Sequence, residues 1–580
     1  MKRFIVRLSL LVAVAFVNTI PMVAEIANAQ PTDSADIVVY GGTSAGVAAA
    51  VQGARMGKRV ILLAEGKHVG GMSSGGLGLT DTGSARTVGG IADEFYHEIY
   101  NYYLDPKAWK YERREDFVSW MPDHWGVDGK RTEQTQRKYI FEPHAAEQVF
   151  DQMLKKAGVS VFLEQKLDLK KGVHKEGARI VSITMENGRT FPAKAFVDAT
   201  YEGDLLAKAG VSYTVGREAN SQYGETLNGK YPKPALLIKI DPYVVPGDLS
   251  SGLLPPLVAG PVGKAGDADG LVQAYNFRLC LTDVAENRVS IEKPRNYDPR
   301  NYELLARWIV ARGNKLSPGP SRIGKVALGG KNSNLGINFD RMPNQKTDSN
   351  DGSHFGSDLA GGSRNWPEGS HAKREILWQN HKDYLQGLLW FLGHEPRVPE
   401  SVRSEMLRWG LAKDEFVDND HWPYQIYVRE ARRMISDYVM TEQDARNERK
   451  AEDPVALASY PLDSHSASYF ADKEGKVWRE PGFFVEGHKP FPISYRSIRP
   501  RIEECTNLLV TCCLSATHAA YGSVRMEPVL MMLGQAAGTA ASLAIDEQAP
   551  VQQIPYAQLR KRLQADGQIL EFSKPSGGAL

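Results

Sequence analysis

Residues 36–46, with the sequence DIVVYGGTSAG, decide the fold. The apolar run at their start is typical of a short β-strand, the glycines indicate a tight turn, and the Ala-rich residues 47–56 have the pattern of a helix. A second apolar run, residues 59–64, ends at Glu65, which follows Gly46 by about 20 residues, the spacing expected of an acid that binds ribose. The stretch therefore predicts a strand, turn, helix and strand that bind a dinucleotide.

Each residue type in this unit has a task at a dinucleotide. Gly41 permits the sharp turn, Gly46 lets the helix approach the strand, and the free N–H groups of the helix N-terminus can bind a pyrophosphate. Thr43 replaces the central glycine of the pattern G-x-G-x-x-G, and it would crowd the pyrophosphate unless its hydroxyl bonds a phosphate oxygen. The predicted cofactor contacts of the unit are Gly41, Gly42, Thr43, Ser44, Ala45, Gly46 and Glu65.

Residues 66–78, GKHVGGMSSGGLG, are a run of small residues suited to a backbone that lies against a large ligand, with a flexible surface loop as the alternative. On the Gly-Gly-Thr turn and this Gly-Gly-Met segment, the chain resembles the secreted FAD-dependent oxidoreductases within the glutathione-reductase-like flavoproteins, some of which are labelled xanthan lyase-related. The resemblance implies that the dinucleotide is FAD, and it accommodates Thr43. It adds Gly70, Gly71, Met72 and Ser73 to the predicted cofactor contacts.

Further segments extend this resemblance along almost the whole chain after residue 30. Residues 196–205, FVDATYEGDL, resemble the strand end that returns to FAD, with Tyr201 where many relatives have glycine, and they imply Thr200 as a cofactor contact. Three hairpin-like runs precede that strand end and suit the β-meander of the family. The runs are residues 166–171, 179–185 and 190–198, and the other matching segments are residues 274–282, 460–465 and 493–497.

The predicted fold is α/β. A Rossmann-like FAD-binding domain, with a parallel sheet and a β-meander, is built from N- and C-terminal segments and carries an inserted mixed α+β substrate domain. In the insertion, residues 302–311 and 375–392 have helical spacing, whereas residues 241–270 and 344–370 are expected to be irregular. The predicted boundaries are 1–29 for a signal peptide, 30–215 and 456–550 for the two parts of the FAD-binding domain, 216–455 for the substrate or cap domain, and 551–580 for a C-terminal helix and tail.

Near the C-terminus, residues 507–511 read as a buried strand, and a helix is expected from about Pro528 to residue 545. Gly534 and Gly538 make one face of that helix narrow, which suits either a flavin or sheet nearby or close helix packing. The resemblance implies that the helix N-terminus points at the pyrimidine side of the flavin, with Arg525 and Met526 as cofactor contacts. A structural ion pair of Arg525 with Glu503, Glu504 or Glu527 is the alternative.

Oxidation of an alcohol or amine needs a base near the carbon that gives up hydride, and histidine is the usual candidate. His465 and His518 stand in segments that match the family, and Asp463 could orient His465. Arg278 and Arg496 could hold a carboxylate or sugar oxygens, although a structural role is open for each of these residues. The predicted catalytic residues are His518, His465, Arg525, Asp463 and Arg278, and His144 is given no role.

The composition narrows the classes of partner. Among 580 residues, Lys plus Arg is 70 and Asp plus Glu is 69, so the strong positive field of a nucleic-acid-binding protein is missing. The four cysteines have no metal-binding spacing, so no metal is predicted. A disulfide between Cys505 and Cys512 is one alternative, and buried thiols are the favoured one.

The first residues have the pattern of a secretory signal. Three cations, Lys2, Arg3 and Arg7, precede the apolar residues 8–17, and Ala-Asn-Ala at 27–29 predicts cleavage after Ala29. We therefore predict a periplasmic or secreted protein without a membrane span after cleavage, with a retained anchor as the alternative.

Together these patterns predict an exported FAD-dependent oxidoreductase that removes hydride from a small polar substrate, with a sugar or sugar-derived alcohol as a candidate from the resemblance. Its electron acceptor is unknown, with oxygen, a quinone or a carrier protein as options. The alternative is a flavin-bearing carbohydrate-binding or carbohydrate-processing protein in which FAD is structural. Thr43 and Tyr201, both in place of glycines, favour that alternative.

Overall fold

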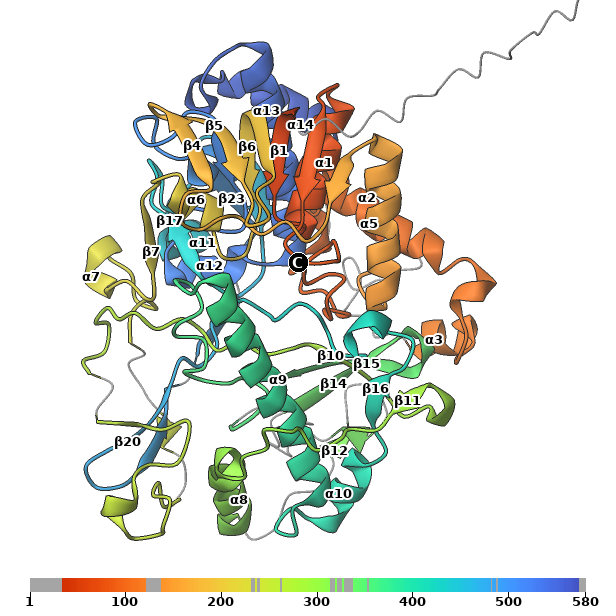
Figure 1. Ribbon diagram of the computed structural model, residues 1–580, viewed down its shortest axis with the longest axis vertical. Helices are drawn as coiled ribbons and strands as arrows, with labels where there is room; N and C mark the ends of the chain where they lie inside the picture. The colour runs from red at the N-terminus through yellow and green to blue at the C-terminus, as the bar shows by residue number, and fades with distance from the viewer. Residues whose placement is uncertain are drawn as a thin grey trace, which may run out of the picture. The chain divides into compact units, whose positions relative to one another are not determined.

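The computed structural model describes most of the chain beyond residue 33 (Figure 1). The described residues are 34–120, 137–230, 235–236, 240–260, 263–312, 319–320, 326–327, 337–351, 354–480, 482–486 and 489–572. They belong to one compact unit, Asp33–Leu580. The expected signal peptide and its cleavage site after Ala29 lie outside them and stay predictions.

The dinucleotide motif lies in a seven-stranded sheet, counted over the described residues, with the order β3-β2-β1-β6-β5-β4 and with β24 paired to β6. The strands are β1 Ala35–Tyr40, β2 Val60–Leu63, β3 Ser160–Phe162, β4 Val173–Glu176, β5 Arg179–Thr184, β6 Thr190–Asp198 and β24 Leu508–Val510. β1, β2, β3, β6 and β24 pair in parallel, whereas β4, β5 and β6 form an antiparallel meander. The predicted fold class is confirmed, because strands from both ends of the chain share one Rossmann-like sheet.

One predicted strand of the meander is wrong. Residues 166–171 contain no strand, and β4 begins at Val173 instead. The carboxylate of Asp168 accepts a hydrogen bond from the backbone N of Lys170 at 2.9 Å, and Gly172 N donates to the Asp168 carbonyl at 2.8 Å. These bonds close a turn within the run that the pattern predicted to be extended. Asp side chains often stabilise such turns.

The sheet is buried on both faces. Side chains of Ile37 and Val39 lie in one apolar cluster, and those of Val38 and Tyr40 lie in another, because successive side chains of a strand point to opposite faces. The helices of this part are α1 Ser44–Arg55, α2 Gly90–Tyr102, α3 Arg114–Trp120, α5 Pro143–Ala157, α6 Asp204–Lys208, α12 His518–Val524, α13 Glu527–Asp546 and α14 Tyr556–Ala565.

The narrow face of α13 packs on α1. A Cβ atom added at Gly534 would lie 2.1 Å from the Ala45 carbonyl oxygen, and one added at Gly538 would lie 2.4 Å from that of Ala49. Close helix packing therefore explains these glycines. Among the described residues, α13 alone is long and apolar enough to cross a membrane, and 94% of its most apolar window is buried inside the protein, as in a core helix.

The inserted region holds a second, antiparallel sheet of order β11-β16-β10-β15-β14. Its strands are β10 Leu279–Thr282, β11 Arg288–Val289, β14 Ile337–Met342, β15 Lys346–Asp351 and β16 Gly410–Ala412. The helices are α7 Asn220–Tyr223, α8 Arg300–Ala311, α9 His371–His394, α10 Glu400–Met406 and α11 Glu442–Ala445. Both predicted helices of this region are confirmed. The predicted loop 344–370 is partly wrong, because a strand, β15, pairs with β10 and β14 inside it.

Short strands complete the unit. They are β7 Tyr213–Val215, β8 Ala235–Leu236, β9 Val258–Ala259, β12 Gly319–Pro320, β13 Val326–Ala327, β17 Arg432–Met434, β18 Pro454–Ala458, β19 Leu462–Asp463, β20 Tyr469–Ala471, β21 Val477–Arg479, β22 Phe484–Val485 and β23 Phe491–Ser494. The four cysteines are buried free thiols, so the favoured alternative for them is confirmed. The domain boundaries stay predictions.

Candidate functional site

A cavity of about 550 Å³ lies where the turn between β1 and α1 meets the end of β2. The predicted cofactor residues that line it are Gly41, Gly42, Thr43, Glu65, Gly71 and Thr200. Cationic side chains also line it, from Lys67, Lys166 and Arg374, as do the aromatic rings of Trp366, Trp378 and Tyr424. A helix N-terminus, cations and aromatic walls together suit a large flat ligand that carries phosphate groups.

The turn at the start of the cavity requires its first and last glycine. Gly41 has a φ of +114°, and a Cβ atom there would lie 2.5 Å from the carbonyl carbon of Ala199. A Cβ atom on Gly46 would lie 1.9 Å from the carbonyl oxygen of Gly41. Larger residues would therefore push α1 away from the turn and widen the phosphate end of the cavity.

Thr43 uses its hydroxyl within the protein. The Oγ1 atom donates to the carbonyl of Ala199 at 2.7 Å and accepts from the backbone N of Gly46 at 3.2 Å, so Thr43 is the N-cap of α1. The Thr43 hydroxyl therefore does not need a phosphate partner, because these two hydrogen bonds already hold it in place.

Glu65 lies at the end of β2, half-buried at the cavity wall. The hydroxyl of Tyr40 donates to Glu65 Oε1 and accepts from the backbone N of Leu167 at 3.0 Å. Burial, together with the nearby carboxylates of Glu202 and Asp204, raises the pKa of Glu65 to about 8. Glu65 thus keeps one oxygen beyond Tyr40 for a ligand hydroxyl, as the spacing from Gly46 predicts.

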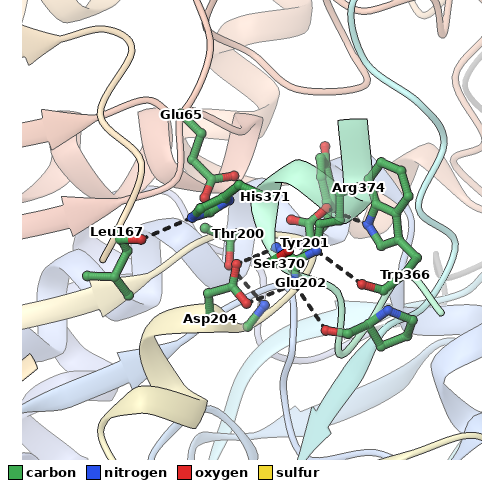
Figure 2. A network of polar contacts seen from close by, with 12 residues as sticks. Glu65, Leu167, Thr200, Tyr201, Glu202, Asp204, Trp366, Ser370, His371 and Arg374 are labelled. Atoms are coloured by element: carbon green, nitrogen blue, oxygen red, sulfur yellow. Dashed lines mark hydrogen bonds and ion pairs between the residues drawn. The ribbon is translucent and has the colours of Figure 1, made fainter. Parts of the chain in front are cut away.

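The first turn of α9 contributes His371 and Arg374 to the cavity wall, where they join a network of polar contacts (Figure 2). Arg374 NH2 donates to Asp204 Oδ1 at 2.9 Å, and His371 Nε2 lies 3.0 Å from the carbonyl oxygen of Leu167. Trp366 Nε1 donates to Glu202 Oε1 at 3.0 Å. These contacts could not be predicted from a local pattern, because Trp366 stands in the predicted loop and the first turn of α9 belongs to the inserted region.

Glu527 joins three segments that were predicted to contact the cofactor. Its carboxylate accepts from Ser44 Oγ at 2.6 Å, from Ser73 Oγ at 3.0 Å and from the Tyr201 hydroxyl at 2.8 Å. Tyr201 in turn accepts from the backbone N of Met72 at 3.0 Å. The tyrosine that stands in place of a glycine is therefore part of the framework that fixes the glycine-rich segment.

The remaining predicted cofactor residues lie behind the cavity wall. Residues 69–80 are buried, so the surface-loop alternative for the glycine-rich segment is wrong over that part. Gly70 N donates to the carbonyl of Gly42 at 2.7 Å, which ties the segment to the turn. The predicted contacts that are buried without lining the cavity are Ser44, Ala45, Gly46, Gly70, Met72, Ser73, Arg525 and Met526.

Three predicted catalytic residues lie in one closed ring of polar contacts, which we call the His465 ring. Nδ1 of His465 lies 2.5 Å from Asp358, and Asp358 pairs with Arg429 at 2.9 Å. The Arg429 guanidinium lies 4.6 Å from the centre of the Tyr427 ring, and the Tyr427 hydroxyl accepts from Arg525 NH1 at 2.6 Å. Arg525 NH2 pairs with Asp463 at 2.8 Å, and Asp463 lies 3.7 Å from His465 Nε2.

The ring corrects two expectations about its members. Asp358, and not Asp463, makes the short contact with His465, because its carboxylate lies on the Nδ1 side of the imidazole. Arg525 pairs with Asp463 instead of Glu503, Glu504 or Glu527. Burial and Arg429 lower the pKa of His465, but Asp358 and Asp463 outweigh them and raise it.

His518 has a similar carboxylate partner but a different second contact. Its Nδ1 lies 2.8 Å from Glu430, and its Nε2 lies 3.0 Å from the Ser464 hydroxyl. The His518 side chain is 3% exposed, whereas that of His465 is 20% exposed. His465 is therefore the more accessible of the two histidines.

Two further arginines and an aspartate complete the surroundings. Arg278 forms a two-bond pair with Asp348, at 2.7 and 2.6 Å, and Arg496 pairs with Asp453 away from the ring. Asp81 accepts from the Tyr460 hydroxyl at 3.1 Å, and its charge interacts with those of Arg278 and Arg525. Four residues of this region were not predicted from the sequence, because no local motif marks them: Asp81, Asp358, Tyr427 and Arg429.

Among solved structures, similar chains include a flavin-containing monooxygenase from Stenotrophomonas maltophilia, with 17% identity and a TM-score of 0.18 over 33% of this chain and 43% of that one. An anhydrotetracycline hydroxylase from Streptomyces rimosus has 11% identity and a TM-score of 0.20 over 32% and 36% of the two chains. A 3-ketosteroid dehydrogenase from Rhodococcus jostii RHA1 has 15% identity and a TM-score of 0.18 over 31% and 49%. Each match thus spans less than half of the solved chain.

No curated protein matches the chain. The family model described as FAD dependent oxidoreductase matches residues 36–563, which include both parts of the seven-stranded sheet, the cavity and the His465 ring. The chain therefore belongs to the family of FAD-dependent oxidoreductases.

Proposed function

We propose that this oxidoreductase takes a hydride from the carbinol carbon of a small polar substrate, with sugars and sugar-derived alcohols as the candidate class. FAD, when bound, supplies the acceptor for that hydride. The single observation that carries the proposal is the His465 ring, in which a partly exposed histidine has Nδ1 paired with Asp358 at 2.5 Å while Nε2 lies 3.7 Å from Asp463, beyond hydrogen-bond distance.

The residues of the cavity fit FAD. The capped N-terminus of α1 and the cation of Lys67 suit its phosphates, and the free oxygen of Glu65 suits a ribose hydroxyl. The side chains of Thr43 and Tyr201 hold the framework of the site, so their presence in place of glycines does not favour a purely structural FAD.

His465 is proposed to accept the hydroxyl proton of the substrate at Nε2. Asp358 holds the Nδ1 side and thereby fixes the orientation of the imidazole, as carboxylates commonly do for histidines. Arg525, which donates to Tyr427 and pairs with Asp463 beside His465, is proposed to stabilise the negative charge that develops on the substrate oxygen.

Export is part of the proposal and rests on the signal pattern of residues 1–29. A periplasmic or secreted enzyme would acquire FAD and pass electrons outside the cytoplasm. Its partners would be a small-molecule substrate and an electron acceptor of unknown identity, without nucleic acid.

The test is the visible spectrum of the purified mature protein, taken before and after anaerobic addition of a pool of neutral sugars and alcohols. Bleaching of the flavin that is lost in His465→Gln would support the proposal. A flavin that stays oxidised with every alcohol, while other donors reduce it, would contradict it.

A further inference from the structure

The surroundings of His465 hold many charges in close balance. Arg278 pairs with Asp348, Arg429 with Asp358 and Arg525 with Asp463, at 2.6 to 2.9 Å. Arg479 donates to Ser466 and to His354, and the charges of Asp351 and Asp358 act on it. In this part of the described chain, the cations are Arg278, Arg429, Arg479, Arg525 and the imidazolium form of His465, and the carboxylates are Asp81, Asp348, Asp351, Asp358 and Asp463.

Three of the carboxylates, Asp348, Asp358 and Asp463, already pair with arginines, and the other two, Asp81 and Asp351, lie in surroundings that disfavour negative charge. Burial raises the pKa of Asp351, and the charge of Asp358 raises it further. Burial also raises the pKa of Asp81, against the opposing charges of Arg278 and Arg525. An anionic substrate would add a charge to carboxylates that already resist ionisation.

The arginines cannot turn to such an anion without a loss elsewhere. The side chains of Arg278 and Arg525 are each 3% exposed, and that of Arg429 is fully buried. A guanidinium that left its aspartate for a ligand would leave a buried carboxylate unpaired, which is strongly unfavourable.

The cluster still has unused hydrogen-bond donors, and the charged ones among them are already paired with carboxylates. Nε of Arg429, Nε of Arg525 and Nε2 of Gln273 are buried without a hydrogen-bond partner among the described residues. Gln273 Oε1 meanwhile accepts from the backbone N of His465 at 3.0 Å, so its amide lies beside the ring. Hydroxyl and carbonyl oxygens can use such donors, whereas a primary ammonium group would meet Arg525 and His465 as like charges.

Resting on the proposed function, we propose that the substrate is uncharged around its reacting carbon. It is a neutral alcohol or polyol, and neither a hydroxy acid nor an amino alcohol.

The experiment compares three probes with one carbon skeleton, propane-1,2-diol, lactate and 1-aminopropan-2-ol, added to the FAD-loaded protein. Binding is measured as the saturable change in the visible flavin spectrum. The diol is expected to bind the wild type at least tenfold more tightly than either charged probe. Asp463→Asn frees Arg525, so the affinity of lactate relative to that of the diol should rise at least tenfold over the ratio in the wild type.

Asp453→Asn is the matched control, because it frees Arg496 outside the ring and should leave all three affinities unchanged. If Asp463→Asn does not fold, Asp358→Asn frees Arg429 in the same way. Lactate or 1-aminopropan-2-ol binding the wild type as tightly as the diol would overturn the inference alone. If no probe perturbs the flavin in the wild type or in the folded variants, the ring does not adjoin the flavin and the proposed function fails with it.

Discussion

Two histidines of this protein have the same kind of partner and different surroundings. His465 and His518 each place Nδ1 within 3 Å of a buried carboxylate, Asp358 for the first at 2.5 Å and Glu430 for the second at 2.8 Å. The second nitrogen of His518 accepts or donates a hydrogen bond with the hydroxyl of Ser464 at 3.0 Å, whereas that of His465 lies 3.7 Å from Asp463, too far for a hydrogen bond. A carboxylate–histidine pair alone therefore does not mark a base, and the second nitrogen decides.

The largest effect is expected from His465→Gln. If His465 accepts the substrate proton, its loss should slow anaerobic flavin reduction by about 10²–10⁴-fold, while the flavin spectrum of the oxidised protein stays unchanged. The measurement is stopped-flow absorbance at saturating substrate. A variant that reduces its flavin within a factor of about three of the wild type would remove His465 from the chemistry.

His518→Ala should change stability more than chemistry. The substitution leaves Glu430 buried without its histidine and is expected to cost about 3–5 kcal/mol of unfolding free energy, seen as a lower midpoint in urea. Although burial raises the pKa of Glu430, His518 and Arg433 lower it to about 2. The stability from Glu430 is thus present above its ordinary pKa of 4.5 and is lost as pH falls from there towards about 2.

The matched variant for that pH effect is Glu430→Gln. Its unfolding free energy should depend less steeply on pH between about 4.5 and 2 than that of the wild type. An unchanged slope would show that the pair of Glu430 and His518 adds nothing to the stability of the protein in acid.

The cofactor half of the site could be predicted from sequence because its chemistry is local. Gly41, Gly46 and Glu65 fall within one strand–turn–helix–strand unit, where backbone sterics fix the spacing. The position of β24 in the same sheet also followed from a short apolar run. The same reasoning was wrong at Asp168, where a turn closed by the Asp168 side chain replaces the strand that the apolar pattern predicted.

The His465 ring could be predicted only in part, because its members come from four segments that lie far apart in the sequence. Asp463, His465 and Arg525 stood in motifs, whereas Asp358 came from an expected loop. Residues 429–433, REARR, hold four charged side chains that are all buried, although such a run is usually a solvated face. Their burial depends on partners in distant parts of the sequence, such as Glu218 for Arg433 at 2.9 Å, which no local pattern contains.

Asp358→Asn should change the pH dependence of flavin reduction, which tests the role of the carboxylate beside His465. The pKa of His465 is raised, so the neutral form that accepts a proton grows as pH rises through that value, and flavin reduction should accelerate in the same direction. Without the charge of Asp358, which raises the pKa of His465, the inflection should move to lower pH. The pH profile of the reduction rate measures this, and an unmoved inflection would show that another group controls the step.

The smallest effect is expected from Ser464→Ala, which removes the hydroxyl at Nε2 of His518 and leaves the His465 ring intact. The loss of one neutral hydrogen bond should cost about 0.5–1.5 kcal/mol in a urea titration, with flavin reduction within about twofold of the wild type. Ser464 lies next to His465 in sequence, so the substitution also tests whether the two histidines communicate. A large loss of reduction rate without a matching loss of stability would mean that His518 acts on the substrate through Ser464. In that case the second nitrogen of His518 would be as functional as that of His465, and exposure would no longer separate the two.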